Sequence, residues 1–131
     1  ADHLRLFARL RMLENEVEDA VAATLARVEL LNHADKPAGR LSGGMKRKLC
    51  GACALIGDPQ IVLLDEPSAG LDPVSQRNLW NLIKATMAGR AVVLTTHSMV
   101  EADFLCDRIG IMVQGQLRCL GTSDHLKQRY A

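Results

Sequence analysis

The residues best suited to chemistry stand at the ends of two apolar runs. Asp65 and Glu66 directly follow the apolar run 61–64, and His97 follows a second run that begins at Ala91. Two adjacent carboxylates suit two tasks, because one can help to hold Mg²⁺ near phosphates while the other polarises a water molecule for attack. A histidine taken alone is more often structural than catalytic. If both runs are strands of one parallel sheet, all three side chains come to the edge where such sheets bind ligands.

A second group of residues could bind an anion. Ser42, Gly43 and Gly44 lie in the segment LSGGMKRKL (41–49) and precede a helical pattern. The first backbone N–H groups of a helix are free to bind an anion, glycine lets the anion come close, and the serine adds a hydroxyl. The plain structural alternative is that Ser42 only caps the helix.

Helices are predicted for the first third of the chain. A helix that begins at Ser42 ends at Gly57, and a loop over 32–40 precedes it. Two earlier helices each repeat apolar residues at helical spacing. The predicted buried faces are Leu6, Leu10 and Leu13 in the first helix, and Val17, Val21, Leu25 and Val28 in the second.

Strands alternate with helices in the remainder, which predicts an α/β fold with a parallel sheet. The run 61–64 is continuously apolar, as in a strand buried on both faces. Asp72 followed by Pro73 begins a helix that reaches Gly89. The later predicted elements are a buried strand at 91–96, a helix at 98–106, a hairpin of 109–113 with 116–120, and a helix from about 123.

Composition narrows the possible functions. The 131 residues are 48% hydrophobic, so the chain can form a core. It carries 16 Lys+Arg against 15 Asp+Glu, and a net charge of +1 does not favour nucleic acid as a partner. The basic triplet 46–48 is interpreted as a solvated helix face. No apolar run approaches the roughly 20 residues of a membrane-spanning helix, and the start at Ala1 suggests a piece of a longer protein.

The four cysteines favour structure over chemistry. Cys50 and Cys53 form a C-x-x-C inside a predicted helix, and Cys106 and Cys119 do not add a second pair at zinc-ribbon spacing. Small, buried thiols in a reducing compartment are the favoured interpretation, with metal or redox chemistry as the alternative.

Four segments together resemble the ABC-type ATPases. LSGGM (41–45), IVLLDEP (61–67), SAGLD (68–72) and TTHS (95–98) occur in the order of that family's signature motif, Walker B motif, D-loop and H-loop. LFARL (6–10) is similar to the helical subdomain that follows the family's Q-loop. LSGGMKRKL and the segment 97–121 are most similar to the A subfamily of ABC transporters, whose members typically move lipids or sterols.

The resemblance implies a P-loop NTPase fold with a RecA-like core. Residues 1–57 would be the ABC helical subdomain with the signature helix, and residues 58–131 the C-terminal part of the catalytic core. The chain has no G-x-x-x-x-G-K-[ST] segment, so the phosphate-binding Walker A loop is missing from it, as are the Q-loop and the aromatic residue that stacks on adenine.

The resemblance also implies a role for each motif residue. Asp65 would bind Mg²⁺, Glu66 would be the general base, and His97 would contact the γ-phosphate of ATP and the D-loop. Ser42, Gly43 and Gly44 would bind the phosphates of an ATP held by a second nucleotide-binding domain in a head-to-tail dimer. Ser68 and Asp72 of the D-loop would couple the two sites. Met45 replaces the glutamine of the general signature, which leaves that side-chain contact open.

The implied context is a transporter. The other partners would be its transmembrane domains, no nucleic acid is expected, and the domain would lie on the cytoplasmic face of a membrane. Two alternatives remain: a soluble ABC-type ATPase that acts on ribosomes or DNA, and a degenerate ABC module without catalysis.

Overall fold

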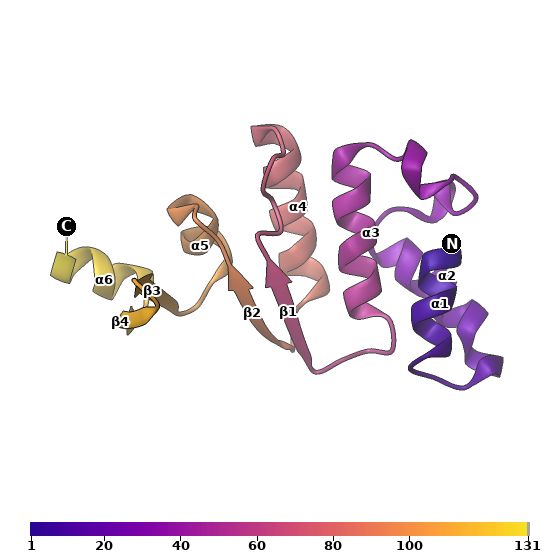
Figure 1. Cartoon of the computed structure of the whole chain (residues 1–131), viewed down its shortest axis with the longest axis horizontal. Helices are drawn as coiled ribbons and strands as arrows, with labels where there is room; N and C mark the ends of the chain where they lie inside the picture. Colours follow the sequence, from indigo (N-terminus) through magenta and orange to yellow (C-terminus); the bar gives the residue numbers. More distant parts are fainter. Residues whose placement is uncertain (131) are drawn as a thin grey trace. The chain divides into compact units, whose positions relative to one another are not determined.

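The computed structural model describes residues 1–130, and the side chains of residues 1–129. It divides into two compact units, Ala1–Thr95 and Thr96–Ala131. Figure 1 shows the order of the elements along the chain. The family resemblance implies a different division, at residue 57, between a helical subdomain and the catalytic core. That division stays a prediction.

The first unit begins with three packed helices. They are α1 (Asp2–Arg9), α2 (Val17–Arg27) and α3 (Gly43–Leu55), joined through short 3-10 helices η1 (Glu14–Glu16), η2 (Leu31–His33) and η3 (Ala38–Arg40). The face predicted for α2 is confirmed, because all four of its apolar residues are at most 4% exposed. These side chains form the core between the helices, with Leu30, Leu55 and Ile56.

The face predicted for the first helix is wrong. Leu6, Leu10 and Leu13 are 59%, 74% and 68% exposed, whereas Leu4 and Ala8 are fully buried. Leu4 and Ala8 are four residues apart and so share one face of α1, which packs on α2 and α3. Since α1 ends at Arg9, Leu10 and Leu13 do not continue its helical face.

A β-α-β unit completes the first compact unit. Strands β1 (Ile61–Asp65) and β2 (Ala91–Thr95) pair in parallel, in a register that places Asp65 opposite Thr95. Helix α4 (Pro73–Thr86) connects them and lies beside α3 (Figure 1). Its start is the predicted one, because the Asp72 carboxylate accepts hydrogen bonds from the backbone N–H groups of residues 74 and 75, both at 3.1 Å. Its buried residues are Leu79, Trp80 and Ile83, followed by Met87.

The strands are not buried on both faces, contrary to the sequence prediction. Val62 is 2% exposed, but Ile61 and Leu63 on the other face of β1 are 67% and 72% exposed, and Val93 of β2 is 60% exposed. Within the first unit the helices cover one face of the strand pair, and the apolar side chains on the other face are exposed. An exposed apolar face of this kind is typical of a surface that another segment or partner covers.

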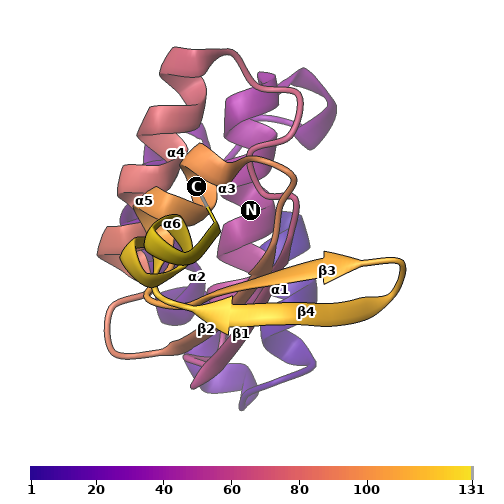
Figure 2. The ribbon, with the colours of Figure 1, turned by 90° about the vertical axis from the view of Figure 1, so that its left-hand side faces the viewer.

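The second unit is a helix, a hairpin and a helix. Its elements are α5 (Met99–Leu105), β3 (Ile109–Val113), β4 (Gln116–Gly121) and α6 (Ser123–Tyr130). Figure 2 shows β3 and β4 as an antiparallel ribbon. Gln114 and Gly115 have φ of 50° and 75°, the left-handed pair that a two-residue hairpin turn requires. The core of this unit is formed by Ala102, Ile109 and Leu126.

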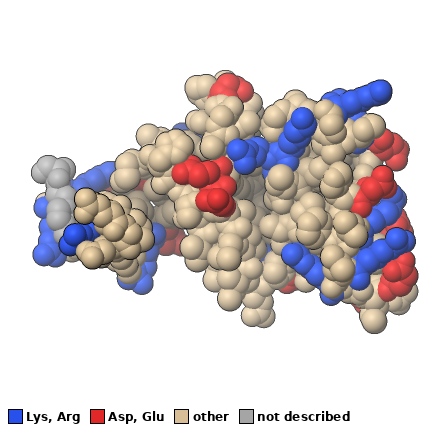
Figure 3. All heavy atoms as spheres, viewed as in Figure 1, with Lys and Arg blue, Asp and Glu red and all other residues tan. Residues whose placement is uncertain are grey.

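Surface charge gives no single-sign face in the view of Figure 3. Basic and acidic side chains are interspersed over the helical part of the first unit. Among residues 1–130, no helix has the length and apolar character needed to cross a bilayer.

Candidate functional site

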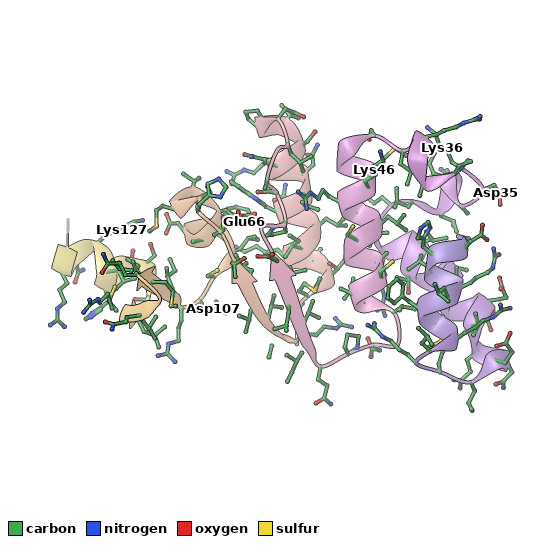
Figure 4. All side chains as sticks on the ribbon, viewed as in Figure 1. Asp35, Lys36, Lys46, Glu66, Asp107 and Lys127 are labelled. Atoms are coloured by element: carbon green, nitrogen blue, oxygen red, sulfur yellow. The ribbon has the colours of Figure 1, made fainter. Side chains whose placement is uncertain are left out.

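The carboxyl end of β1 carries the predicted acid pair. The Thr95 hydroxyl donates a hydrogen bond to the Asp65 carboxylate across the two strands. The backbone N–H of Glu66 donates to the Thr95 carbonyl oxygen at 3.0 Å and to its Oγ1 at 3.3 Å. The paired strand therefore holds the carboxylate of Asp65 and the backbone of Glu66, and Figure 4 shows Glu66 just beyond the end of β1.

Glu66 has a strained backbone. Its φ of 45° lies in the left-handed region, which costs a residue other than glycine on the order of 1–3 kcal/mol. The conformation is held on both sides, because the Glu66 N–H binds Thr95 and the Glu66 carbonyl accepts the N–H of Ala69 at 3.2 Å. The chain thus turns sharply after β1, and the Glu66 side chain is partly exposed.

The segment 68–72 links this turn to α4. Ser68 is only 3% exposed, and its carbonyl accepts the N–H of Leu71 at 3.3 Å. Hydrogen bonds from the Ser75 side chain and backbone, and from the Val74 N–H, lower the pKa of the Asp72 carboxyl. Asp72 therefore acts as an ionised helix cap, whereas the coupling role implied for Ser68 and Asp72 stays a prediction.

The segment LSGGM (41–45) forms the start of α3, as predicted. Ser42 Oγ accepts the Met45 N–H at 3.3 Å, and the Ser42 carbonyl accepts the Lys46 N–H at 2.9 Å. Helix geometry then leaves the N–H groups of Gly43 and Gly44 without an intrahelical acceptor. A Cβ built on Gly44 would meet nothing within 4 Å, so packing within the chain does not require glycine there. The serine is a cap, and the glycine amides stay available to an anion.

The basic triplet of α3 is not simply a solvated face. Arg47 Nη2 donates to the carbonyl oxygen of Ala69 at 3.0 Å, and Lys48 forms an ion pair with Glu29 at 2.5 Å. Only Lys46 of the three is exposed, near the start of α3 (Figure 4). Sequence reasoning missed Arg47 because its partner is a backbone carbonyl 22 residues away, for which no sequence pattern exists.

His97 lies in the second compact unit. It is exposed and follows β2 by two residues, ahead of the α5 cap in which Ser98 Oγ accepts the Glu101 N–H at 3.3 Å. The structure brings Asp65 and Glu66 together with Thr95. The expectation that His97 joins them stays a prediction.

The donor set at β1 fits a magnesium ion shared with phosphates. Within the described part of the chain, no three His, Cys, Asp or Glu residues gather as a metal site. Mg²⁺ binds through one or two carboxylates and keeps waters and phosphate oxygens as its other ligands, so the exposed Asp65 carboxylate beside a hydroxyl is compatible with it.

The cysteines are free thiols, but the prediction that they are buried is wrong for Cys50, which is exposed, while the other three are half-buried. Burial raises the pKa of Cys53 and of Cys106, so both stay protonated at neutral pH. A raised pKa makes a thiol a poor nucleophile and a poor metal ligand, which supports the structural interpretation of these two residues.

Comparisons with known proteins show which sequences this chain resembles. Residues 5–103 match the family model described as "AAA domain, putative AbiEii toxin, Type IV TA system". The chain is 52% identical over 132 residues to ABC transporter A family member 12 of Arabidopsis thaliana, covering 98% of the chain and 14% of that protein. It is 53% identical over 131 residues to ATP-binding cassette sub-family A member 7 of Mus musculus, covering 98% and 6%.

Solved structures show the same fold. The cbiO1 protein from Clostridium perfringens, part of the ABC transporter complex cbiONQ, superposes with a TM-score of 0.79 at 28% identity, covering 89% of the chain and 47% of that protein. An ATP-binding subunit of an ABC transporter gives a TM-score of 0.76 at 29% identity, covering 98% and 55%.

The chain belongs to the AAA domain family whose model it matches, with the fold of the P-loop NTPases. Within that class it resembles the ATP-binding domains of ABC transporters, and its sequence is similar to those of the A subfamily, as its motifs predicted. It spans about 14% of the plant relative and 6% of the mouse relative.

Proposed function

We propose that this chain is part of the domain with which an ABC transporter of the A subfamily binds and hydrolyses ATP. The observation that carries the proposal is the acid pair at the carboxyl end of β1, registered against Thr95 and followed by a held turn at Glu66. Phosphoryl transfer needs little covalent chemistry from the protein. Catalysis depends mainly on positioned charged groups such as these two carboxylates.

Asp65 and Glu66 divide the work at this edge. Asp65 helps to hold Mg²⁺, which neutralises charge on the phosphates when it is bound. Glu66, with its backbone fixed by Thr95 and Ala69, accepts a proton from the water that attacks the γ-phosphate. His97 contacts that phosphate from the segment that follows β2.

The start of α3 serves a different ATP molecule. Ser42, Gly43 and Gly44 present a hydroxyl and two amides to the phosphates of an ATP held by a second nucleotide-binding domain, in a head-to-tail dimer. The D-loop residues Ser68 and Asp72 flank Ala69 and Leu71, which approach α3 in the chain's own fold, and they couple the two sites. The remaining partners are the transmembrane domains of the transporter, which place this domain on the cytoplasmic face of a membrane. Lipid is the proposed cargo, carried over from the A-subfamily resemblance.

The test is steady-state ATP hydrolysis by the complete protein that contains these residues. Glu66→Gln removes the base while keeping size and hydrogen bonding, and we expect kcat to fall by at least about 100-fold with the Kd for Mg-ATP retained. Glu16→Gln, an exposed acid in η1, is the matched control and should leave kcat unchanged. Equal kcat for Glu66→Gln and the original protein contradicts the assigned role, and no hydrolysis by the original protein contradicts the proposed function.

The 131 residues by themselves should neither bind ATP tightly nor hydrolyse it. They contain no G-x-x-x-x-G-K-[ST] loop, which supplies most of the phosphate contacts in P-loop enzymes. Isothermal titration of the isolated chain with Mg-ATP tests this expectation, and a low-micromolar Kd would show that it is wrong.

A further inference from the structure

Arg47 joins two segments that the proposed chemistry uses separately. Its Nη2 donates to the carbonyl oxygen of Ala69 at 3.0 Å, in a partly buried position. The same two segments meet a second time nearby, because a Cβ built on Gly43 would lie 3.7 Å from Cδ2 of Leu71. Helix α3 and the segment after β1 are therefore joined by one hydrogen bond and lie close together at a second point.

Ala69 belongs to a hydrogen-bonded series that ends at the acid pair. The Ala69 N–H donates to the Glu66 carbonyl at 3.2 Å, the Glu66 N–H donates to Thr95, and the Thr95 hydroxyl donates to Asp65. Every member of this series lies in the first compact unit. Arg47 thus fixes the far end of a turn whose first residue is Glu66.

That turn needs an external restraint. Glu66 sits at a φ of 45°, a conformation that relaxes unless the surrounding contacts hold it. Of the described hydrogen bonds to the turn, the one from Arg47 is charge-assisted, which makes it stronger than the neutral backbone bonds.

We propose that Arg47 is a positioning residue for ATP hydrolysis, which holds the 66–69 turn through the Ala69 carbonyl and so keeps Glu66 aimed at the attacking water. The catalytic part of this inference rests on the proposed function. The contact between Arg47 and the turn rests on the hydrogen bonds alone. Arginine suits the task because its planar guanidinium loses less freedom for each hydrogen bond it forms than the flexible ammonium of lysine.

The experiment compares four variants of the complete protein. Arg47→Met removes the guanidinium and keeps much of the aliphatic stem, and Arg47→Lys keeps the charge and a donor. Lys46→Met removes the adjacent, exposed charge of the same helix. Arg11→Met controls for loss of stability, because Arg11 Nη1 binds the carbonyl oxygens of Cys53 and Ile56 at the other end of α3, at 3.1 and 3.2 Å.

Two readouts are needed, kcat with KM for Mg-ATP, and hydrogen exchange of the peptide 66–72. For Arg47→Met we expect kcat to fall about tenfold, KM to stay within about twofold, and exchange of 66–72 to rise about tenfold. Arg47→Lys should recover part of kcat. Lys46→Met should match the original protein in both readouts, and Arg11→Met should do so in kcat even where its melting temperature is lower.

Each result decides the matter. Unchanged exchange of 66–72 in Arg47→Met overturns the contact, whether or not the protein is an ATPase. Faster exchange with unchanged kcat in an active protein overturns the positioning role and leaves the proposed function standing. A similar fall of kcat in Arg11→Met would show that the loss of kcat in Arg47→Met comes from general destabilisation, and it also overturns the positioning role of Arg47. Absence of hydrolysis in the original protein refutes the proposed function, and the positioning role with it, while exchange still reports on the contact.

Discussion

Replacing Gly44 by alanine should separate folding from activity within one helix. Gly44 is the second residue of α3, and its φ lies outside the left-handed region, so alanine can adopt its conformation. A Cβ at this position meets nothing within 4 Å in the chain. Alanine is about 0.8–1.0 kcal/mol more favourable than glycine inside a helix, and near the helix start the gain lies between zero and that value. We therefore expect α3 to be as stable as before, or slightly more stable.

Activity should change in the opposite direction. The open space over Gly44 is where the proposed phosphate approaches the amides of α3, and a methyl group there keeps the phosphate from one of them. Loss of one charge-assisted hydrogen bond to an amide is worth about 1.5–3 kcal/mol, so kcat/KM for ATP should fall about 10- to 150-fold.

The matched control is Gly51→Ala. Gly51 lies two turns further along α3 and also has open space at its Cβ, so the same chemical change should stabilise the helix without loss of activity. ATP hydrolysis by the complete protein and hydrogen exchange of the peptide 43–55 are the two measurements. A destabilised α3 in Gly44→Ala, or activity equal to that of Gly51→Ala, would refute the reasoning.

Two further predictions concern stability. Leu4→Ala should lower the free energy of unfolding by about 2–5 kcal/mol, because Leu4 is fully buried. Leu10 is 74% exposed, so Leu10→Ala should change that free energy by no more than about 0.5 kcal/mol. Calorimetric melting compares the two variants, and equal effects would contradict the corrected face of α1. The lowered pKa of Asp72 means that its ionised form stabilises α4, so this stabilisation is present above the ordinary Asp pKa and is lost as pH falls through the lowered one. Hydrogen exchange of α4 in acid should show this loss, and Asp72→Asn, which keeps a capping oxygen without the charge, should show a smaller pH dependence; identical profiles would contradict it.

The sequence by itself determined the local features of the fold. Ser42 and the pair Asp72-Pro73 cap their helices as predicted, and Gln114 with Gly115 forms the predicted hairpin turn. Each depends on a few neighbouring residues, whose backbone preferences and short side-chain hydrogen bonds are legible in the sequence. The four ordered motifs likewise predicted the family before any geometry was known.

Only the tertiary structure decided which apolar residues are buried. Leu4 and Leu6 are equally apolar and lie two positions apart. Packing against α2 and α3 buries Leu4 and leaves Leu6 exposed. The run 61–64 has the composition of a strand that is buried on both faces, yet within the first unit only one face of β1 is buried. Burial depends on which segments pack against an element, and the hydrophobic pattern of the element does not carry that information.

The tertiary structure also decided how the candidate site is held together. The contact of Arg47 with Ala69 and the left-handed backbone of Glu66 leave no local trace, because a backbone carbonyl has the same chemistry at every residue and strain is imposed by distant partners. The sequence thus identified the acids and the glycines by their types and spacing. The pairing of β1 with β2 and the packing of α3 beside the turn determined how firmly the acids are positioned.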